Sequence, residues 1–185
     1  MVREYEKKIS RVERVVVLID GSNILHASRK FAEKNAIPNY KIDYKKLEEA
    51  VLGERPCIRT YFFCSRKVPP DPVEQGFQEA LQSLGFTVIS RPLHERHRQG
   101  KRTYVEKGVD VALVTEMLCL AYNDAYDTVV VVSGDGDYKM AIERVKQLGK
   151  RVEVASFRDS ISRDLRLTAD KFIELDSLAG RMKKE

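Results

Sequence analysis

The chain has 185 residues, of which 43% are hydrophobic and 33% are charged, and this length and composition suit one soluble globular domain. No apolar run approaches the roughly 18 residues that a membrane span needs, and the charged first ten residues contain no signal-peptide pattern, so we expect a cytoplasmic protein with no membrane partner. The formal net charge is +5, and three cysteines without CxxC spacing predict neither a disulfide framework nor a zinc site.

Short apolar runs alternate with helical patterns between a charged arm, residues 1–12, and a polar tail, residues 179–185. This pattern predicts one domain over residues 13–178. Strands are expected at 14–19, 58–64, 87–90, 128–133, 152–156 and 172–175, and helices at 22–34, 43–52, 72–84, 109–122, 138–148 and 161–168.

Two of the predicted strands, residues 15–19 and 129–132, are apolar without alternation. Continuous apolar runs of this length are typical of strands covered on both faces, at the centre of a parallel sheet. Strand–helix alternation around such strands predicts a three-layer α/β fold with right-handed crossovers. Ligands in folds of this kind bind beyond the carboxyl ends of the strands, where the strand order reverses.

Polar residues follow both central strands: Asp20-Gly-Ser-Asn23 and Ser133-Gly-Asp135-Gly-Asp137. If the strands are neighbours, their spacing of about 4.8 Å brings Asp20 and Asp135 close enough to share a metal ion. Clustered carboxylates repel one another, and hard cations such as Mg²⁺ or Mn²⁺ relieve that repulsion. The alternative is that these motifs are only turns, with Ser22 and Asp137 capping the next helices. For the pair of motifs we favour metal binding.

A third acid, Asp110, lies in the first turn of the helix expected at 109–122, whose apolar positions cover most of its surface. Such a helix packs deep in the fold, so its first turn is held near the core. The alternative is that Asp110 only complements the helix dipole, an effect of about 0.3–1 kcal/mol. Lys107, just before the helix, either contacts a phosphate or is merely exposed.

Basic residues are concentrated between Arg91 and Lys107, where six Lys or Arg residues face two acids and account for +4 of the net charge. A local basic strip indicates a polyanion partner, with nucleic acid favoured over a membrane surface. Four of its residues lie within seven positions and are expected in a flexible hairpin or loop: Arg96, Arg98, Lys101 and Arg102. The alternative is a solvated charged loop without a partner.

Several catalytic classes lack their motifs. The chain has no GxGxxG after the first strand and no GxxxxGK[ST] anywhere, so dinucleotide and P-loop nucleotide binding are excluded. It also lacks the GxSxG elbow of Ser/His hydrolases.

Four blocks in order along the chain resemble the NYN domain family, the LabA-like branch of the PIN-domain superfamily: Asp20-Gly-Ser-Asn23, Lys107-Gly-Val-Asp110, Ser133-Gly-Asp135-Gly-Asp137-Tyr and Ala169-Asp-Lys-Phe172. The resemblance spans about residues 14–176. It implies a PIN-like parallel sheet in the order 3-2-1-4-5 and a divalent-metal-dependent ribonuclease site. By motif it implies four acidic site residues and metal ligands, Asp20, Asp110, Asp135 and Asp137, with Asn23 and Ser133 as polar supports.

The sequence therefore predicts a phosphodiesterase that acts on single-stranded or structured RNA with Mg²⁺ or Mn²⁺. Ser133, Lys107 and the basic strip would contact the RNA. PIN domains often carry a further acid in an earlier helix, and the sequence leaves four candidates open: Glu48, Glu49, Glu74 and Glu79. Two other functions also stay open, a non-catalytic RNA-binding or scaffold domain and a Toprim-like acidic phosphotransfer enzyme. A homo-oligomer is one option for the assembly.

Overall fold

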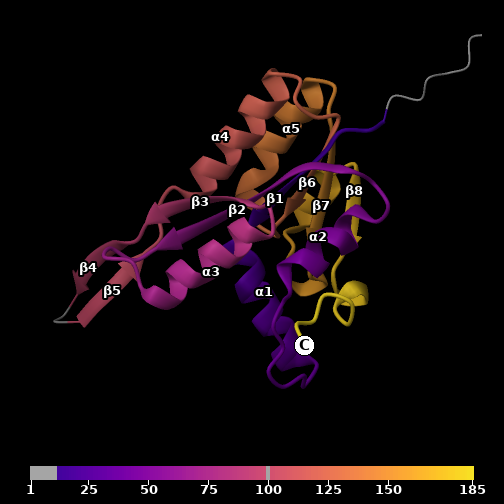
Figure 1. The fold of residues 1–185 in the computed structure, drawn as a ribbon. Helices are drawn as coiled ribbons and strands as arrows, with labels where there is room; N and C mark the ends of the chain where they lie inside the picture. Colours follow the sequence, from indigo (N-terminus) through magenta and orange to yellow (C-terminus); the bar gives the residue numbers. More distant parts are fainter. Residues whose placement is uncertain (1–11, 99–100) are drawn as a thin grey trace, which may run out of the picture.

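The structure is a computed structural model that describes residues 12–98 and 101–185, so nearly all of the predicted N-terminal arm lies outside the described residues. Six parallel strands form the main sheet in the order β3-β2-β1-β6-β7-β8 (Figure 1). Their bounds are β1 Val15–Asp20, β2 Cys57–Arg66, β3 Thr87–Pro92, β6 Thr128–Val132, β7 Arg151–Ser156 and β8 Lys171–Glu174. The predicted order of five strands is confirmed, and β8 extends it at one edge of this α/β fold.

Helices cover both faces of the sheet. One layer contains α1 Gly21–Lys34, α2 Tyr44–Leu52 and α3 Pro72–Ser83, and the other contains α4 Val109–Tyr122, α5 Lys139–Gln147 and α6 Arg163–Thr168. Three short 3₁₀ turns complete the chain: η1 Gly136–Tyr138, η2 Arg158–Ser160 and η3 Asp176–Leu178. No helix of the described residues has the length and apolar character to cross a membrane.

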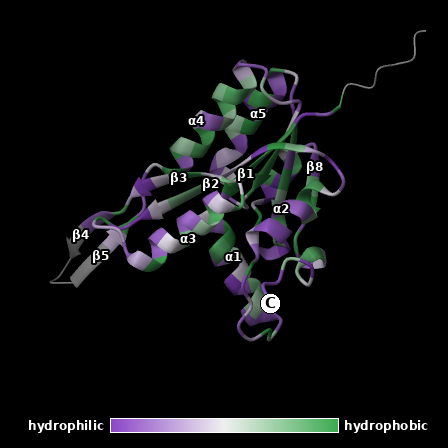
Figure 2. Ribbon diagram, viewed as in Figure 1, coloured by the Kyte–Doolittle hydropathy of each residue, from purple (hydrophilic) through white to green (hydrophobic). Residues whose placement is uncertain are grey.

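The two central strands are buried along their whole length. Val15, Val17 and Ile19 of β1 pack in the hydrophobic cluster with α1 and α2, whereas Val16 and Leu18 pack in the cluster with α4 and α5. Successive side chains of a strand point to opposite faces, so a strand between two helical layers must be apolar at every position. Figure 2 shows this concentration of hydrophobic residues along the centre of the sheet.

A separate two-stranded hairpin, β4 His94–Arg98 and β5 Lys101–Val105, is inserted between β3 and α4. It projects from the edge of the sheet at which β2 and β3 end (Figure 1). The hairpin coincides with the basic strip, and its register places the Arg98 backbone opposite Lys101 and that of His97 opposite Arg102. The side chains of residues 96–103 lie outside the described part of the structure.

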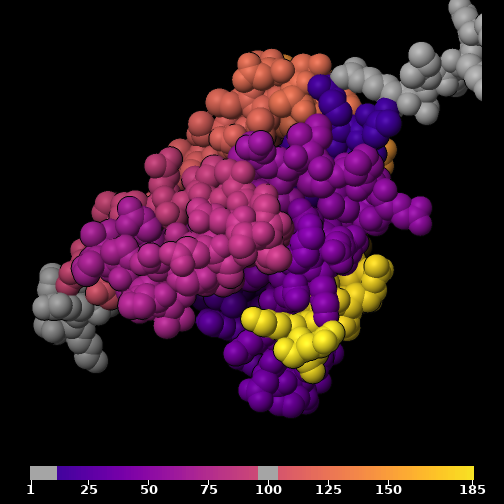
Figure 3. Space-filling model, in the orientation of Figure 1, coloured from indigo at the N-terminus to yellow at the C-terminus, as the bar shows by residue number. Residues whose placement is uncertain are grey.

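Residues 179–185, expected as a polar tail, are packed against the domain. Met182 is fully buried in the cluster of α1 and α2. The amide of Asp43 donates to the carbonyl of Met182 at 2.8 Å, and the amide of Lys184 donates to the carbonyl of Lys41 at 2.9 Å. Figure 3 shows this C-terminal segment lying on the surface formed by the residues before α2. One apolar residue in a polar sequence therefore anchors the segment to the core.

Candidate active site

The acidic motifs meet at the carboxyl ends of β1 and β6. These strands are neighbours in register, with Ile19 opposite Val132, so Asp20 and Ser133 follow side by side at the edge of the sheet. Strand order reverses between β1 and β6, because β2 and β3 lie on one side of β1 while β7 and β8 lie beyond β6. The site therefore lies at the switch point where α/β folds bind their ligands.

Asp20 is the most enclosed of these acids, with only 6% of its surface exposed. Its Oδ1 accepts a hydrogen bond from the Asn23 amide at 3.0 Å, and its Oδ2 accepts from the Tyr138 hydroxyl at 2.8 Å and the Ser133 hydroxyl at 3.2 Å. Burial raises the pKa of Asp20, the hydrogen bonds oppose this shift, and the nearby charge of Glu106 adds to it. Three donors thus fix the orientation of a carboxylate that its surroundings make costly to ionise.

Ser133 and Asn23 connect the two motifs. Ser133 is fully buried, and its hydroxyl donates to Asp20 while accepting from the Asp135 amide at 3.2 Å. The Asn23 Oδ1 accepts from the Gly134 amide at 2.9 Å. The Ser133 hydroxyl is thus buried with two partners in place, and its assignment to RNA contacts stays a prediction. Both side chains thus link the loop after β1 to the loop after β6.

A glycine is required at position 134 by close packing. A Cβ built there would come within 2.0 Å of the carbonyl oxygen of Ser160. Glycine at this position therefore lets the loop after β6 pack directly against η2.

The capping alternative named the wrong residues. Asp20 itself caps α1, and the Asp135 Oδ1 accepts from the Asp137 amide at 3.0 Å and so caps η1. Ser22 and Asp137 do not cap these elements. Asp137 is exposed and Asp135 is half-buried. One oxygen of Asp135, Oδ2, has no hydrogen-bond partner among the described residues and is available to a ligand.

Asp110 is brought to the same place by the start of α4. The helix begins after Gly108 without a side-chain cap, and Asp110 is exposed in its first turn. Burial raises the pKa of the Tyr138 hydroxyl, and the charges of Asp20, Asp135 and Asp110 raise it further. The charges of all three carboxylates therefore act on one hydroxyl, which bonds to Asp20. Tyr138 is a site residue that the sequence analysis did not assign.

Glu106 is a second residue missing from the sequence assignments. The hydroxyl of Ser22 donates to its Oε2 at 2.6 Å, across 84 positions of the chain, and its charge contributes to the raised pKa of Asp20, after burial. It directly precedes Lys107, which is exposed. Glu106 stands one residue before the block Lys107-Gly-Val-Asp110 that resembles the family.

The four acids left open lie elsewhere. Glu48 is buried where its Oε1 accepts from Thr60 and its Oε2 pairs with Lys45, towards the opposite edge of the sheet. Glu49 is exposed on α2, and Glu79 accepts from Gln75 on α3. Glu74 accepts from the Lys67 amide at 3.0 Å on the wall of a groove that reaches Ser22. None of the four hydrogen-bonds to the Asp20 network in the described part of the chain.

The charge balance at this edge is unlike that elsewhere. Four carboxylates have no ion-pair partner among the described residues: Asp20, Asp110, Asp135 and Asp137. In contrast, Asp127 pairs with Arg14 at 2.7 Å, and Glu153 pairs with Arg55 at 2.8 Å. Uncompensated oxygen donors suit a hard divalent cation. No group of three described Asp, Glu, His or Cys side chains is arranged closely enough to hold a metal by itself.

The fold and the ordered acidic motifs define a class of protein, the PIN-like α/β domains. The NYN domain profile matches residues 14–176, and the chain belongs to the NYN domain family. This family includes PIN-like nucleases, which supports a nuclease-type function at the level of the family.

Two curated relatives span most of the chain. It is 30% identical to the low amplitude and bright protein LabA of Synechococcus elongatus over 94% of its own length and 90% of that protein. It is 27% identical to an uncharacterised protein of Methanocaldococcus jannaschii over 92% of its own length and 60% of that protein.

A protein of unknown function from Vibrio parahaemolyticus has the same fold. It superposes with a TM-score of 0.71 at 23% identity and covers 95% of this chain and 98% of its own.

Proposed function

We propose that the protein is a divalent-metal-dependent ribonuclease that hydrolyses phosphodiester bonds at the carboxyl edge of β1 and β6. Asp20 carries the proposal, because it is a nearly buried carboxylate held by three donors and has no cationic partner in the described residues. A helix cap needs one acceptor and no burial. The enclosure of Asp20 is costly unless a cation compensates it.

Asp20, Asp110 and Asp135 are the carboxylates that would hold the proposed Mg²⁺ or Mn²⁺, with water and substrate phosphates as further ligands. When bound, such an ion neutralises charge that develops on the scissile phosphate and activates water as the nucleophile. Mg²⁺ is usually held by one or two carboxylates together with water and substrate phosphates. A site without three closely grouped ligands is compatible with that mode of binding.

The remaining residues hold the carboxylates and the RNA. Tyr138 and Ser133 keep Asp20 Oδ2 in place, and Asn23 ties the start of α1 to the loop after β6. Asp137 positions the attacking water, and Glu106 adds negative charge beside Asp20. Lys107 lies next to the site, and four residues of the hairpin hold the RNA backbone: Arg96, Arg98, Lys101 and Arg102.

The test is cleavage of a mixed RNA pool with Mn²⁺ or with a chelator. We expect metal-dependent cleavage by the wild type and a loss of at least about 100-fold in Asp135→Asn, because a ligand carboxylate contributes several kcal/mol of transition-state stabilisation through the metal. Asp71→Asn is the matched control, since Asp71 caps α3 through its Oδ1 as Asp135 caps η1. Asn caps well, so this control should cleave normally.

Full metal-dependent cleavage by Asp135→Asn would contradict the proposed site. RNA binding without cleavage under any divalent metal would favour the non-catalytic alternative. The NYN domain match over residues 14–176 supports a PIN-like nuclease over the Toprim-like alternative.

A further inference from the structure

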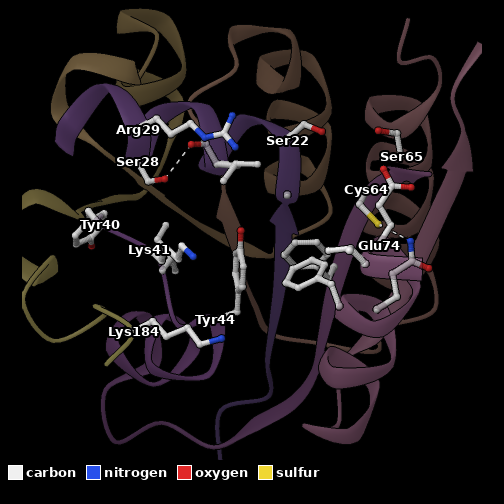
Figure 4. A pocket seen from close by; sticks show the side chains of 17 residues that line it. Ser22, Ser28, Arg29, Tyr40, Lys41, Tyr44, Cys64, Ser65, Glu74 and Lys184 are labelled. Atoms are coloured by element: carbon white, nitrogen blue, oxygen red, sulfur yellow. Dashed lines mark hydrogen bonds between the residues drawn. The ribbon is translucent and has the colours of Figure 1, made fainter. Parts of the chain in front are cut away.

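A groove of about 750 Å³ runs between α1 and α3 beside the candidate active site. Phe62 of β2, which is only 2% exposed, and Tyr44 of α2 line it, as do Gly21 and Ser22, directly after Asp20. Figure 4 shows polar side chains on both walls and aromatic rings between them. A chain bound at the carboxylates can therefore continue into the groove.

The inner surface of the groove is aromatic. Ring centroids of Tyr44 and Phe62 lie 4.9 Å apart, and Phe77 lies 5.7 Å from each of them. Phe77 is 42% exposed. A Cβ on Gly21 would come within 2.6 Å of the Phe62 ring, so the glycine lets this ring lie directly against the start of α1. A nucleobase can stack on such a surface, because every base has a π-face.

The Tyr44 hydroxyl supplies a polar group within this surface. It points into the groove (Figure 4) and has no hydrogen-bond partner among the described residues. Burial raises the pKa of Tyr44 to about 12, so the hydroxyl is a neutral donor near pH 7. On the facing wall, the amide of Gln78 and the carboxylate of Glu74 can reach polar edges of a ligand.

Three cations lie on one side of the groove: Arg29, Lys41 and Lys184 (Figure 4). None of them forms an ion pair within the described part of the chain, whereas Lys34 pairs with Asp159 at 2.5 Å and Lys46 with Glu185 at 2.7 Å. Lys184 reaches the groove because the docked C-terminal segment bonds to Lys41 through its backbone. Unpaired cations beside an aromatic surface favour a ligand that combines a flat ring with negative charge.

We propose that the groove binds an unpaired nucleotide of single-stranded RNA, with its base on the aromatic surface and its phosphates against the three cations. This inference rests on the proposed ribonuclease function and names its substrate class. A base within a duplex is stacked on both sides and bonded along its edge, so it cannot enter the groove without unpairing. The protein should therefore prefer single-stranded RNA to duplex RNA of the same length.

Binding in chelator, where no cleavage occurs, tests the groove separately from the chemistry. The probe is a single-stranded RNA that carries 2-aminopurine, whose fluorescence falls when the base stacks on an aromatic ring. We expect quenching by the wild type and at least about fivefold weaker binding by Phe77→Ala, the lower end of the effect of stacking on one ring. Tyr122→Ala is the control, since Tyr122 is an exposed aromatic residue on α4 outside the groove.

A second pair of variants leaves the aromatic packing intact. The double variant Arg29→Gln/Lys41→Gln should bind RNA more weakly. The slope of log affinity against log salt concentration should become shallower by up to about 1.4, because each phosphate contact on a single strand contributes about 0.7. Arg181→Gln with Lys183→Gln removes the same charge from exposed residues that do not line the groove, and it should change binding less.

Equal affinity for duplex RNA, or wild-type binding by both groove variants, would overturn the proposal. Free mononucleotides that bind as tightly as the single strand would also overturn it. A failure of the ribonuclease proposal gives a different result. The groove variants would still bind RNA more weakly than the wild type, but neither the wild type nor any variant would cleave RNA. Cleavage by the wild type together with unaltered binding by the groove variants would reject the groove alone.

Discussion

Asp110 is exposed and lacks a hydrogen-bond partner in the described residues. Its substitution therefore tests whether it is a metal ligand or only complements the dipole of α4. If it is a ligand, Asp110→Asn weakens Mn²⁺ binding and cleavage together. If it only complements the dipole, the change costs about 0.3–1 kcal/mol of stability and leaves Mn²⁺ affinity unaltered. We expect the first outcome. Calorimetric Mn²⁺ titration checks it, with Asp164→Asn in the first turn of α6 as the matched control.

Glu106 is the acid we expect to complete the site. Glu106→Gln keeps an acceptor for Ser22 but removes a negative charge near Asp20. We expect cleavage to fall at least about tenfold, because a cation at this edge loses part of its electrostatic stabilisation. Glu49→Gln, an exposed position on α2, is the control. Initial cleavage rates at fixed Mn²⁺ concentration decide the matter, and equal rates for both variants would exclude Glu106.

We expect Tyr44 to lower the free energy of unfolding as the pH rises above 10. Burial raises its pKa from 10.0 to about 12, so the phenol stabilises the folded protein fully below pH 10. Between pH 10 and 12 the unfolded chain loses this proton while the folded protein keeps it, and stability falls. Tyr44→Phe should reduce that fall by up to about 1.4 kcal/mol per pH unit. Denaturant unfolding of both proteins at pH 9, 10 and 11 measures the difference.

At the scale of elements, the β4–β5 hairpin is the clearest candidate for RNA affinity without chemistry. We consider a variant in which its four basic residues are neutralised: Arg96, Arg98, Lys101 and Arg102. The slope of log RNA affinity against log salt concentration should become shallower by up to about 3. Thermal stability should change little, because the hairpin does not pair with the main sheet. Filter binding at several salt concentrations gives the slope. An unaltered slope would show that these residues are only a solvated hairpin.

The main elements were predictable because their apolar residues follow regular patterns along the sequence. The strands at 15–20 and 128–132 and the helices at 21–34 and 109–122 lie within one residue of the predicted bounds. Apolar residues at every position specify a doubly covered strand, and spacing by three and four specifies a helical face. The hairpin was harder to predict, because the sequence of the basic strip shows no alternation of apolar and polar residues.

The candidate site was predictable only in part for a related reason. Asp20 and Asp135 follow the two buried strands, so topology alone brings them to one edge. Tyr138 bonds to Asp20 across 118 positions and Glu106 bonds to Ser22 across 84. The motif after β6 contains Tyr138, but the partner of each side chain depends on where helices and loops finally pack.

At the scale of the whole molecule, the C-terminal segment belongs to the core. Met182→Ala should cost about 2–5 kcal/mol, because it removes a fully buried side chain from the cluster around α1 and α2. Arg181→Ala, at an exposed neighbour, should stay within about 0.5 kcal/mol. Midpoints of urea unfolding compare the two. Equal midpoints would mean that the segment docks without contributing to stability.

The pairing of β1 with β6 has a consequence for the timing of function. Asp20 is made before its partners from the second motif, Ser133 and Tyr138, which follow 113 and 118 residues later. At about 5–20 residues per second, this is a delay of several seconds or more. During that interval β1 has no neighbour on its β6 side, and the carboxylate lacks two of its three donors. A nascent chain beside the messenger that encodes it thus has no finished acidic site until the second motif has been made.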